Sequence, residues 1–249
     1  MSLTLIIPKR HILISPHEYS QEFLSGCVLR LPLWGYQHRM VGSRFADYLV
    51  YGNHGTPFGG YWEKQGQTRV RGFDGIDDYM DCGHDESLNI TDALTLEAWV
   101  LATGFLANDN SHILRKEGSY GMWVEKSTAC PWGRIWQSDG AEISIPKNKS
   151  INLNEWSHLG IIANPDTFLV EMFTNRELNS QTNYDGTIYA SGAHLFISYY
   201  KDNPPEHWKG FIAEARIYNR GKSPEENRAQ FLYDIQHLPF LVGANYLRR

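Results

Sequence analysis

The amino-acid sequence predicts an all-β protein in which two antiparallel sheets pack as a sandwich. Residues 94–100 alternate between apolar and other side chains, with Leu94, Leu96 and Val100 on one side of the alternation. A period of two is typical of a strand with two different faces. Short apolar segments separated by turn residues continue to Tyr218, and a length of 249 residues fits one such sandwich.

The first predicted strand covers residues 27–33, where Val28 and Leu29 place one side chain on each face. A polar turn follows at residues 51–55, because its glycines and asparagine favour turns and positive φ. In chain order, further strands are predicted within residues 73–83, 94–100, 154–159 and 208–218, and a hairpin turn at 174–177. The loop between the strands at 73–83 and 94–100 is acidic.

Helical signal is confined to the end of the chain. Ser223 can cap a helix, Pro224 suits its first position, and Glu226 lies where a capping box needs it. We therefore expect a helix from residue 224 to about residue 236. Three regions follow: an extended N-terminal arm at 1–25, a sandwich at 26–222, and a helix and tail at 223–249 packed on the sandwich.

Composition narrows the classes of partner. A formal net charge of −5 gives no attraction to nucleic acid or to anionic lipid. The three cysteines, Cys27, Cys82 and Cys130, are far apart and odd in number, so we expect mostly buried thiols. The alternative is one disulfide with one unpaired cysteine. No apolar stretch reaches the roughly 18 residues that cross a bilayer, and the start does not have the pattern of a signal peptide. We expect a soluble chain that is made in the cytoplasm. A virion or an extracellular surface is the final location to consider.

Several motifs resemble one known family. The run from Phe73 to Gly83 contains Phe-Asp-Gly-Xaa-Asp-Asp-Tyr, and it is followed by Leu-Asn-Ile-Thr-Asp and by the strand at 94–100. Further motifs lie at 154–159, 208–218 and 223–226. Their order and spacing resemble the laminin G-like, pentraxin-like branch of the concanavalin A-like lectin and glucanase superfamily. The resemblance implies a jelly roll, and it covers most of the chain, but function must be argued from a site.

The resemblance raises an enzymatic function, which the residues disfavour. Glucanases of this superfamily use a Glu-Xaa-Asp-Xaa-Xaa-Glu strand, which places carboxylates on one concave face. No glutamate of this chain has an aspartate two positions later. The densest acidic cluster, Asp77, Asp78 and Asp81, is interpreted as turn aspartates that cap their own backbone amides. We predict no catalytic residues and no enzyme.

Calcium is the ion that the resemblance implies, beside the turn at 51–55 and the last core strand. Carboxylate, carbonyl and amide oxygens are the ligands that calcium prefers. The ligands to test are Asn53, Asp78 and Glu214, although this chain has Ile-Ala-Glu at 212–214 where the family usually has Ile-Asp-Glu. The prediction is therefore no cofactor, with a structural calcium as the alternative.

Sugar binding requires an exposed aromatic ring beside polar groups, because a ring face packs on C–H groups while hydroxyls need directed hydrogen bonds. The candidates are Trp132, Trp136 and Trp62; Trp132 is expected in a loop. The alternative for each is a core or interface aromatic. The basic residues Arg69, Arg71, Arg115 and Lys116 are interpreted as solvated strand ends.

Three functions remain. The first is a structural component of a large assembly, such as a decoration, capsid-associated or tail protein of a virion, with other protein subunits as partners. Its arm would use the apolar anchors Leu3, Leu5 and Ile7. The second is a carbohydrate-binding, lectin-like module, and the third is a glycoside hydrolase. Weighing these, we expect a noncatalytic module for assembly or surface recognition, with glycan binding as the alternative.

Overall fold

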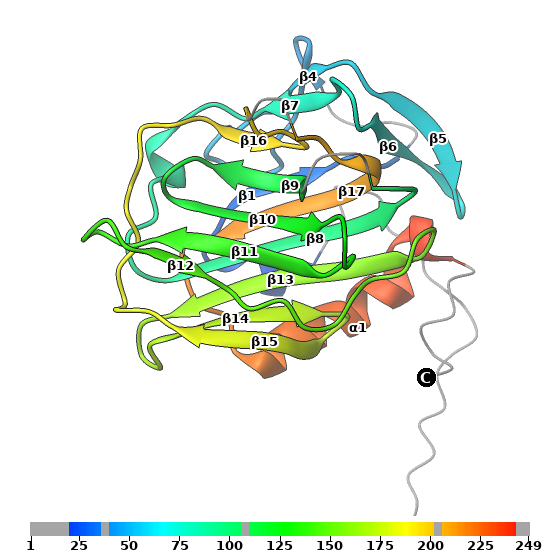
Figure 1. Cartoon of the computed structure of the whole chain (residues 1–249). Helices are drawn as coiled ribbons and strands as arrows, with labels where there is room; N and C mark the ends of the chain where they lie inside the picture. Colours follow the sequence, from blue (N-terminus) through cyan, green and yellow to red (C-terminus); the bar gives the residue numbers. More distant parts are fainter. Residues whose placement is uncertain (1–19, 36–39, 106–109, 202–205, 243–249) are drawn as a thin grey trace, which may run out of the picture.

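The computed structural model describes residues 20–35, 40–105, 110–201 and 206–242. They form two large antiparallel sheets packed face to face, with one long helix behind them (Figure 1). The predicted all-β jelly-roll sandwich with a single α-helix near its C-terminus is confirmed within these residues.

One sheet has eight strands, and the strand with the clearest alternation in the sequence lies near its middle. Seven strands follow the order β15 (Glu177–Asn183), β14 (Leu169–Thr174), β13 (Trp156–Asn164), β8 (Leu94–Ala102), β17 (Lys209–Tyr218), β6 (Thr68–Asp74) and β5 (Tyr61–Gln65). Strand β1 (Cys27–Pro32) pairs with β17 beside this path. The predicted turn at 174–177 joins β14 to β15, and Asn175 and Arg176 adopt the positive φ angles of a tight hairpin turn.

The other sheet has seven strands and lies in front in Figure 1. Their order is β12 (Glu142–Ser144), β11 (Pro131–Trp136), β10 (Tyr120–Glu125), β9 (Asn110–Lys116), β16 (Leu195–Ile197), β7 (Tyr79–Asp81) and β4 (Thr56–Phe58). A small hairpin of β2 (Met40–Val41) and β3 (Arg44–Phe45) precedes β4. A short 3₁₀ turn, η3 (Glu86–Leu88), lies between β7 and β8.

The alternation of β8 separates two apolar cores. Leu94, Leu96 and Val100 belong to the large core between the sheets, whereas Trp99 belongs to a second core on the other side of β8. All nine residues of β8 are buried, because both faces of the strand are covered. The two faces predicted from the sequence therefore exist, but neither of them meets water.

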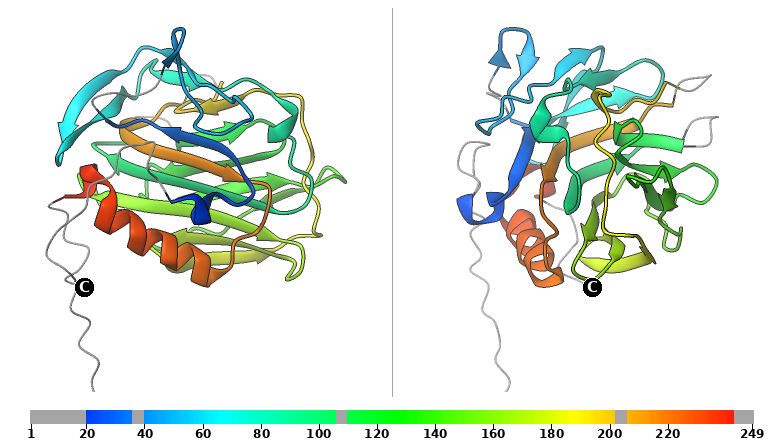
Figure 2. Two further views of the ribbon diagram at one scale, coloured as in Figure 1. Left: turned by 180° about the vertical axis from the view of Figure 1, so that it is seen from behind. Right: turned by 90° about the vertical axis from the view of Figure 1, so that its left-hand side faces the viewer.

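The second core lies under helix α1 (Pro224–His237), which crosses the back of the eight-stranded sheet (Figure 2). The predicted capping box is present: the Ser223 side chain accepts from the Glu226 amide, and the Glu226 side chain accepts from the Ser223 amide. The 3₁₀ turn η4 (Pro239–Leu241) closes this core. Among the described residues, no helix combines the length and the apolar character that crossing a membrane requires.

Only the last part of the predicted arm lies within the described residues. The 3₁₀ turn η2 (Gln21–Leu24) places Phe23 and Leu24 against the second core. The anchors Leu3, Leu5 and Ile7 lie outside the described residues. The arm and its assembly role therefore stay predictions. Cys27, Cys82 and Cys130 are free and buried, as the sequence led us to expect.

Candidate functional site

The candidate site lies on the outer face of the seven-stranded sheet. Alternation along its strands sends every second side chain away from the core. In β16, Leu195 and Ile197 enter the core between the sheets while Phe196 points outward. In β7, Met80 enters the same core, so that Tyr79 lies on the outer face. Aromatic and polar side chains from several strands are thus gathered on one surface.

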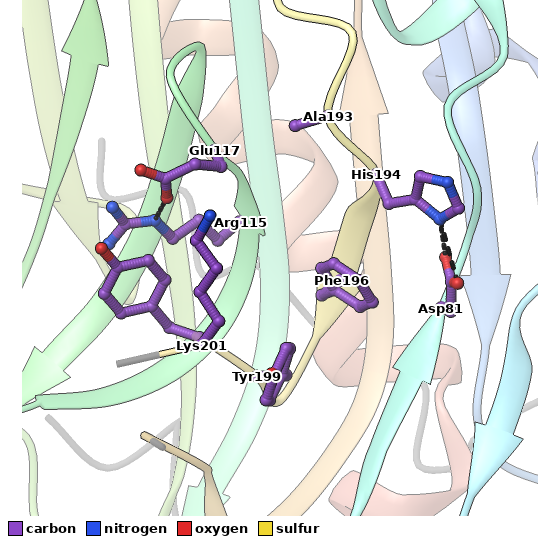
Figure 3. Close-up of a pocket in the computed structure, with 9 residues that line it drawn as sticks. Asp81, Arg115, Glu117, Ala193, His194, Phe196, Tyr199 and Lys201 are labelled. Carbon is purple, nitrogen blue, oxygen red and sulfur yellow. Dashed lines mark hydrogen bonds and ion pairs between the residues drawn. The ribbon is translucent and has the colours of Figure 1, made fainter. Parts of the chain in front are cut away.

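A pocket of about 470 Å³ opens on this face. Figure 3 shows Phe196 and Tyr199 in its middle, the pair of Asp81 and His194 at one end, and Arg115 with Glu117 at the other. Its lining residues are Asp81, Arg115, Glu117, Ala193, His194, Phe196, Tyr199, Tyr200 and Lys201. The pocket therefore has an aromatic middle between two polar ends.

The aromatic middle continues beyond the pocket as a set of packed rings. Tyr199 stacks on Tyr79 with ring centroids 4.9 Å apart, and Tyr79 stacks on Phe58 at 4.5 Å. Phe196 meets Tyr199 edge to face at 5.1 Å. Burial raises the pKa of the Tyr79 hydroxyl, as expected for a ring packed among others. These contacts hold the rings in fixed orientations, which makes them a preformed platform.

The first polar end is an imidazole–carboxylate pair. Nδ1 of His194 lies 2.9 Å and 3.0 Å from the two carboxylate oxygens of Asp81. His84 stacks on the His194 ring with centroids 4.7 Å apart. Both members of the pair are partly exposed, so their remaining hydrogen-bonding positions can meet a ligand.

The second polar end is built around Arg115 of β9. Its Nε donates to Oε2 of Glu117 at 2.8 Å, and its guanidinium lies 3.6 Å from the centroid of the Tyr200 ring. Trp123 and Trp136 lie on the same guanidinium, each with its centroid 5.1 Å away. Arg115 is therefore not the solvated strand end that the sequence suggested, because aromatic rings from three segments enclose it.

The other three basic residues that the sequence assigned to solvated strand ends differ in their burial. Lys116 is fully buried; its Nζ donates to the carbonyl of Ala193 at 2.5 Å, and burial lowers its pKa. Arg71 is also buried, between the rings of Phe45 and Trp62, and Arg69 alone of the four is exposed. The interpretation as solvated strand ends is wrong for three of the four, because aromatic rings pack on Arg71 and Arg115 and the segment at Ala193 accepts from Lys116.

A second depression, of about 360 Å³, lies next to the first along the sheet. Trp136 lines it and also contacts Arg115, so this ring separates the two hollows. The exposed ring of Tyr189 and the polar turn at 137–140 form the rest of its wall. The two hollows together form an elongated surface.

The three tryptophans predicted for sugar binding do not lie together. Trp132 and Trp136 are both in β11 and point to the outer face, where Trp132 packs on Trp123 at 4.8 Å. Trp132 is in a strand, not in the predicted loop. Trp136 is largely buried and donates from Nε1 to Glu142. Trp62 is in β5 of the other sheet and packs against the core with Phe45.

Of the residues considered for calcium, Asp78 and Glu214 have carboxylates engaged in other bonds, whereas Oδ1 of Asn53 is buried and has no hydrogen-bond partner among the described residues. Nδ2 of Asn53 donates to the Val28 carbonyl at 2.8 Å. The carboxylate of Asp78 accepts from the amides of Gly60 and Asp74. Glu214 accepts from Nε of Arg30 and from Nε1 of Trp34, both at 2.7 Å. The calcium ligand set stays a prediction.

Within the described residues, one group of three acidic side chains has carboxylate oxygens close enough to share an ion. It consists of Asp74, Asp77 and Asp78, with these atoms within 4.8 Å of one another. It contains Asp78 but not Glu214. Asp78 accepts from the amide of Asp74, and Asp81 accepts from the amide of Gly83, as the self-capping interpretation predicts for these two aspartates.

Comparison with known proteins gives a family and a fold. A family model described as the concanavalin A-like lectin/glucanases superfamily matches residues 74–226. No curated protein matches the chain in sequence. Solved structures with the same fold include the binding domain of a paraclostridial mosquitocidal protein, with a TM-score of 0.62 and 12% identity over 84% of this chain and 52% of that one.

Two other solved structures illustrate the range of proteins that contain this fold. Botulinum neurotoxin type C, whose cell entry depends on interaction with two ganglioside molecules, has a TM-score of 0.59 and 11% identity over 85% of this chain and 52% of that one. A Trypanosoma rangeli sialidase in complex with sialic acid has a TM-score of 0.59 and 16% identity over 86% of this chain and 34% of that one. This chain thus spans between a third and about half of their lengths, and the likeness is one of fold.

Proposed function

Because this chain belongs to the concanavalin A-like lectin/glucanases superfamily, we propose that it is a noncatalytic carbohydrate-binding module that holds a glycan on the outer face of its seven-stranded sheet. The observation that carries the proposal is the pocket in which Phe196 and Tyr199 lie between two polar ends. We therefore favour lectin-like carbohydrate binding over the assembly role, which was the first choice from the sequence.

The chemistry of the pocket matches the two surfaces of a sugar. A pyranose ring has C–H groups on its faces, which pack on aromatic rings such as Tyr199, and hydroxyls on its rim, which need directed partners. Asp81 and Glu117 can accept hydrogen bonds from such hydroxyls, and Arg115 and Lys201 can donate to them. A volume of about 470 Å³ is in the range of small-molecule sites.

The carboxylates of the pocket support binding more than hydrolysis. A glycosidase needs a general acid and a second carboxylate on opposite sides of the bond that breaks. Here Asp81 pairs with His194, and Glu117 pairs with Arg115. Both carboxylates already have a partner that holds them in place as hydrogen-bond acceptors, which suits the ground state of a bound sugar.

A glycan array followed by titration calorimetry tests the proposal. The full chain should bind at least one class of glycan, and Tyr199→Ala should weaken that binding about fivefold, because stacking on a ring contributes about 1 kcal/mol. Tyr51→Ala is the matched control, since Tyr51 is an exposed tyrosine outside the pocket lining. Equal binding by both variants, or no glycan bound at all, would overturn the proposal.

A further inference from the structure

The second polar end of the pocket contains a donor whose geometry selects a particular kind of sugar. Only 8% of the Arg115 side chain is exposed, and its Nε is used by Glu117. Within the described residues, Nη1 and Nη2 have no hydrogen-bond acceptor. Most of a guanidinium has therefore been removed from water, while two of its three nitrogens remain available to a ligand.

Three aromatic rings hold this guanidinium in one orientation. The rings of Tyr200, Trp123 and Trp136 pack on it, and the bond from Nε to Glu117 fixes its rotation. A guanidinium held in this way loses little conformational freedom when a ligand binds. Its free edge offers parallel N–H donors, and the planar partner that accepts two such donors together is a carboxylate.

The charges at this end also favour an anion. Lys201 is exposed, lines the pocket, and has no hydrogen-bond or ion-pair partner among the described residues. Figure 3 shows its side chain on the same side of the pocket as Arg115 and Glu117, away from the pair of Asp81 and His194. Two cations thus face one carboxylate here, whereas the opposite end supplies Asp81 as an acceptor for hydroxyls.

We propose that the ligand is a carboxylated sugar whose carboxylate is bound by the two Nη atoms of Arg115 beside Lys201. Its ring would lie on Phe196 and Tyr199, and hydroxyls at its other side would reach Asp81 and His194. This inference rests on the proposed function, because it assigns the class of glycan to the same pocket. A neutral sugar would leave the Arg115 donors without a full partner, which costs affinity.

The experiment compares each acidic sugar with its own uncharged form. The probes are the methyl glycosides of glucuronic, galacturonic and sialic acid, and the methyl ester of each, titrated into the full chain and followed by NMR. At least one acid should bind about tenfold more tightly than its ester, since a hydrogen-bonded charge pair contributes about 1.5 kcal/mol or more. Added salt should weaken the binding of the acid and leave that of the ester nearly unchanged.

Substitutions then assign the preference to its residues. Arg115→Gln should bring the acid and the ester to within about twofold of each other. Because Arg115 is packed among rings, its variant needs a melting curve, and Lys201→Gln gives a second test at an exposed position. Lys201→Gln should reduce the preference severalfold, while the control Lys64→Gln, on exposed β5, should not change it.

The outcomes separate the two proposals. If the wild-type chain binds esters or neutral glycans as tightly as acids, the inference falls while the glycan-binding function stands. If neither these probes nor the glycan array shows binding, both fall. If Arg115→Gln does not fold, an unchanged preference in Lys201→Gln overturns the inference, and a lost preference supports it.

Discussion

Nε1 of Trp99 donates to the carboxylate of Asp234 at 2.7 Å, and this bond joins the central strand β8 to helix α1. Nη1 and Nη2 of Arg216 donate to the same carboxylate oxygen, each at 3.1 Å. Around them lies a buried network of three cations and three carboxylates: Arg30, Arg216, Lys222, Glu97, Glu214 and Asp234. The network fastens α1 to the face of the eight-stranded sheet that is turned away from the seven-stranded sheet and its pocket.

Asp234→Ala should destabilise the fold by about 3 kcal/mol or more, because it leaves Arg216 buried with one partner fewer and removes the acceptor of Trp99. Urea unfolding at neutral pH measures the loss. Glu225→Gln is a control on the same helix, where the side chain is exposed and should change stability by less than about 1 kcal/mol. A loss of similar size in both variants would mean that the network contributes little.

Stability should also fall between pH 6.5 and pH 4 because of His158. Its ring is fully buried, neither of its nitrogens has a hydrogen-bond partner within the described part of the chain, and burial lowers its pKa from 6.5 to about 4. Since the unfolded chain binds this proton more readily, stability is intact above pH 6.5 and is lost as the pH falls towards 4. The full effect is about 3 kcal/mol.

Substitution separates His158 from the carboxylates. The attraction of Lys222 and other cations overcomes the opposing effect of burial and lowers the pKa of Glu97 from 4.5 to about 2, so its contribution is lost only below pH 4.5. Glu97 therefore contributes little to the change in unfolding free energy between pH 7 and pH 5. In His158→Leu, the decrease between these two values should shrink by about 2 kcal/mol. An unchanged decrease would assign it to other groups.

Much of the fold could be predicted because it depends on local patterns. The alternation of residues 94–100, the capping box at Ser223 and the turn at 174–177 each involve residues close in sequence. The fate of Glu97 could not be predicted in this way. A glutamate in an alternating strand is typical of a solvent face, and here the partners that make its burial tolerable, Arg216 and Lys222, are more than a hundred residues away.

The site was only partly predictable for the same reason. The aromatic character of Trp132 and Trp136 marked them as candidates, and both are on the face that contains the pocket. Arg115 was misinterpreted, because its principal aromatic partner, Tyr200, comes from a segment far along the chain. The alternation of Leu195, Phe196 and Ile197 gave a usable signal: an aromatic ring between two core residues must face outward.

Calcium gives a further test, because Glu214 cannot bind an ion without giving up its bonds to Arg30 and Trp34. We expect the melting temperature to be the same in millimolar calcium and in EDTA. Differential scanning calorimetry of the full chain measures both. A rise of several degrees with calcium, absent in Asp78→Asn, would instead establish an ion at the acidic loop that contains Asp78.

The two adjacent hollows predict that longer glycans bind more tightly than single sugars. An oligosaccharide that fills the first pocket can extend past Trp136 and reach Tyr189, whose exposed ring lines the second hollow. Tyr189→Ala should therefore weaken binding of an oligosaccharide about fivefold and leave binding of its monosaccharide unit unchanged, because only the longer ligand stacks on this ring. Tyr199→Ala should weaken both, since Tyr199 lines the first pocket. Calorimetric titration of the two variants with a series of increasing chain length checks the order of these effects. Equal loss for short and long ligands in Tyr189→Ala would show that the second hollow does not form a separate subsite.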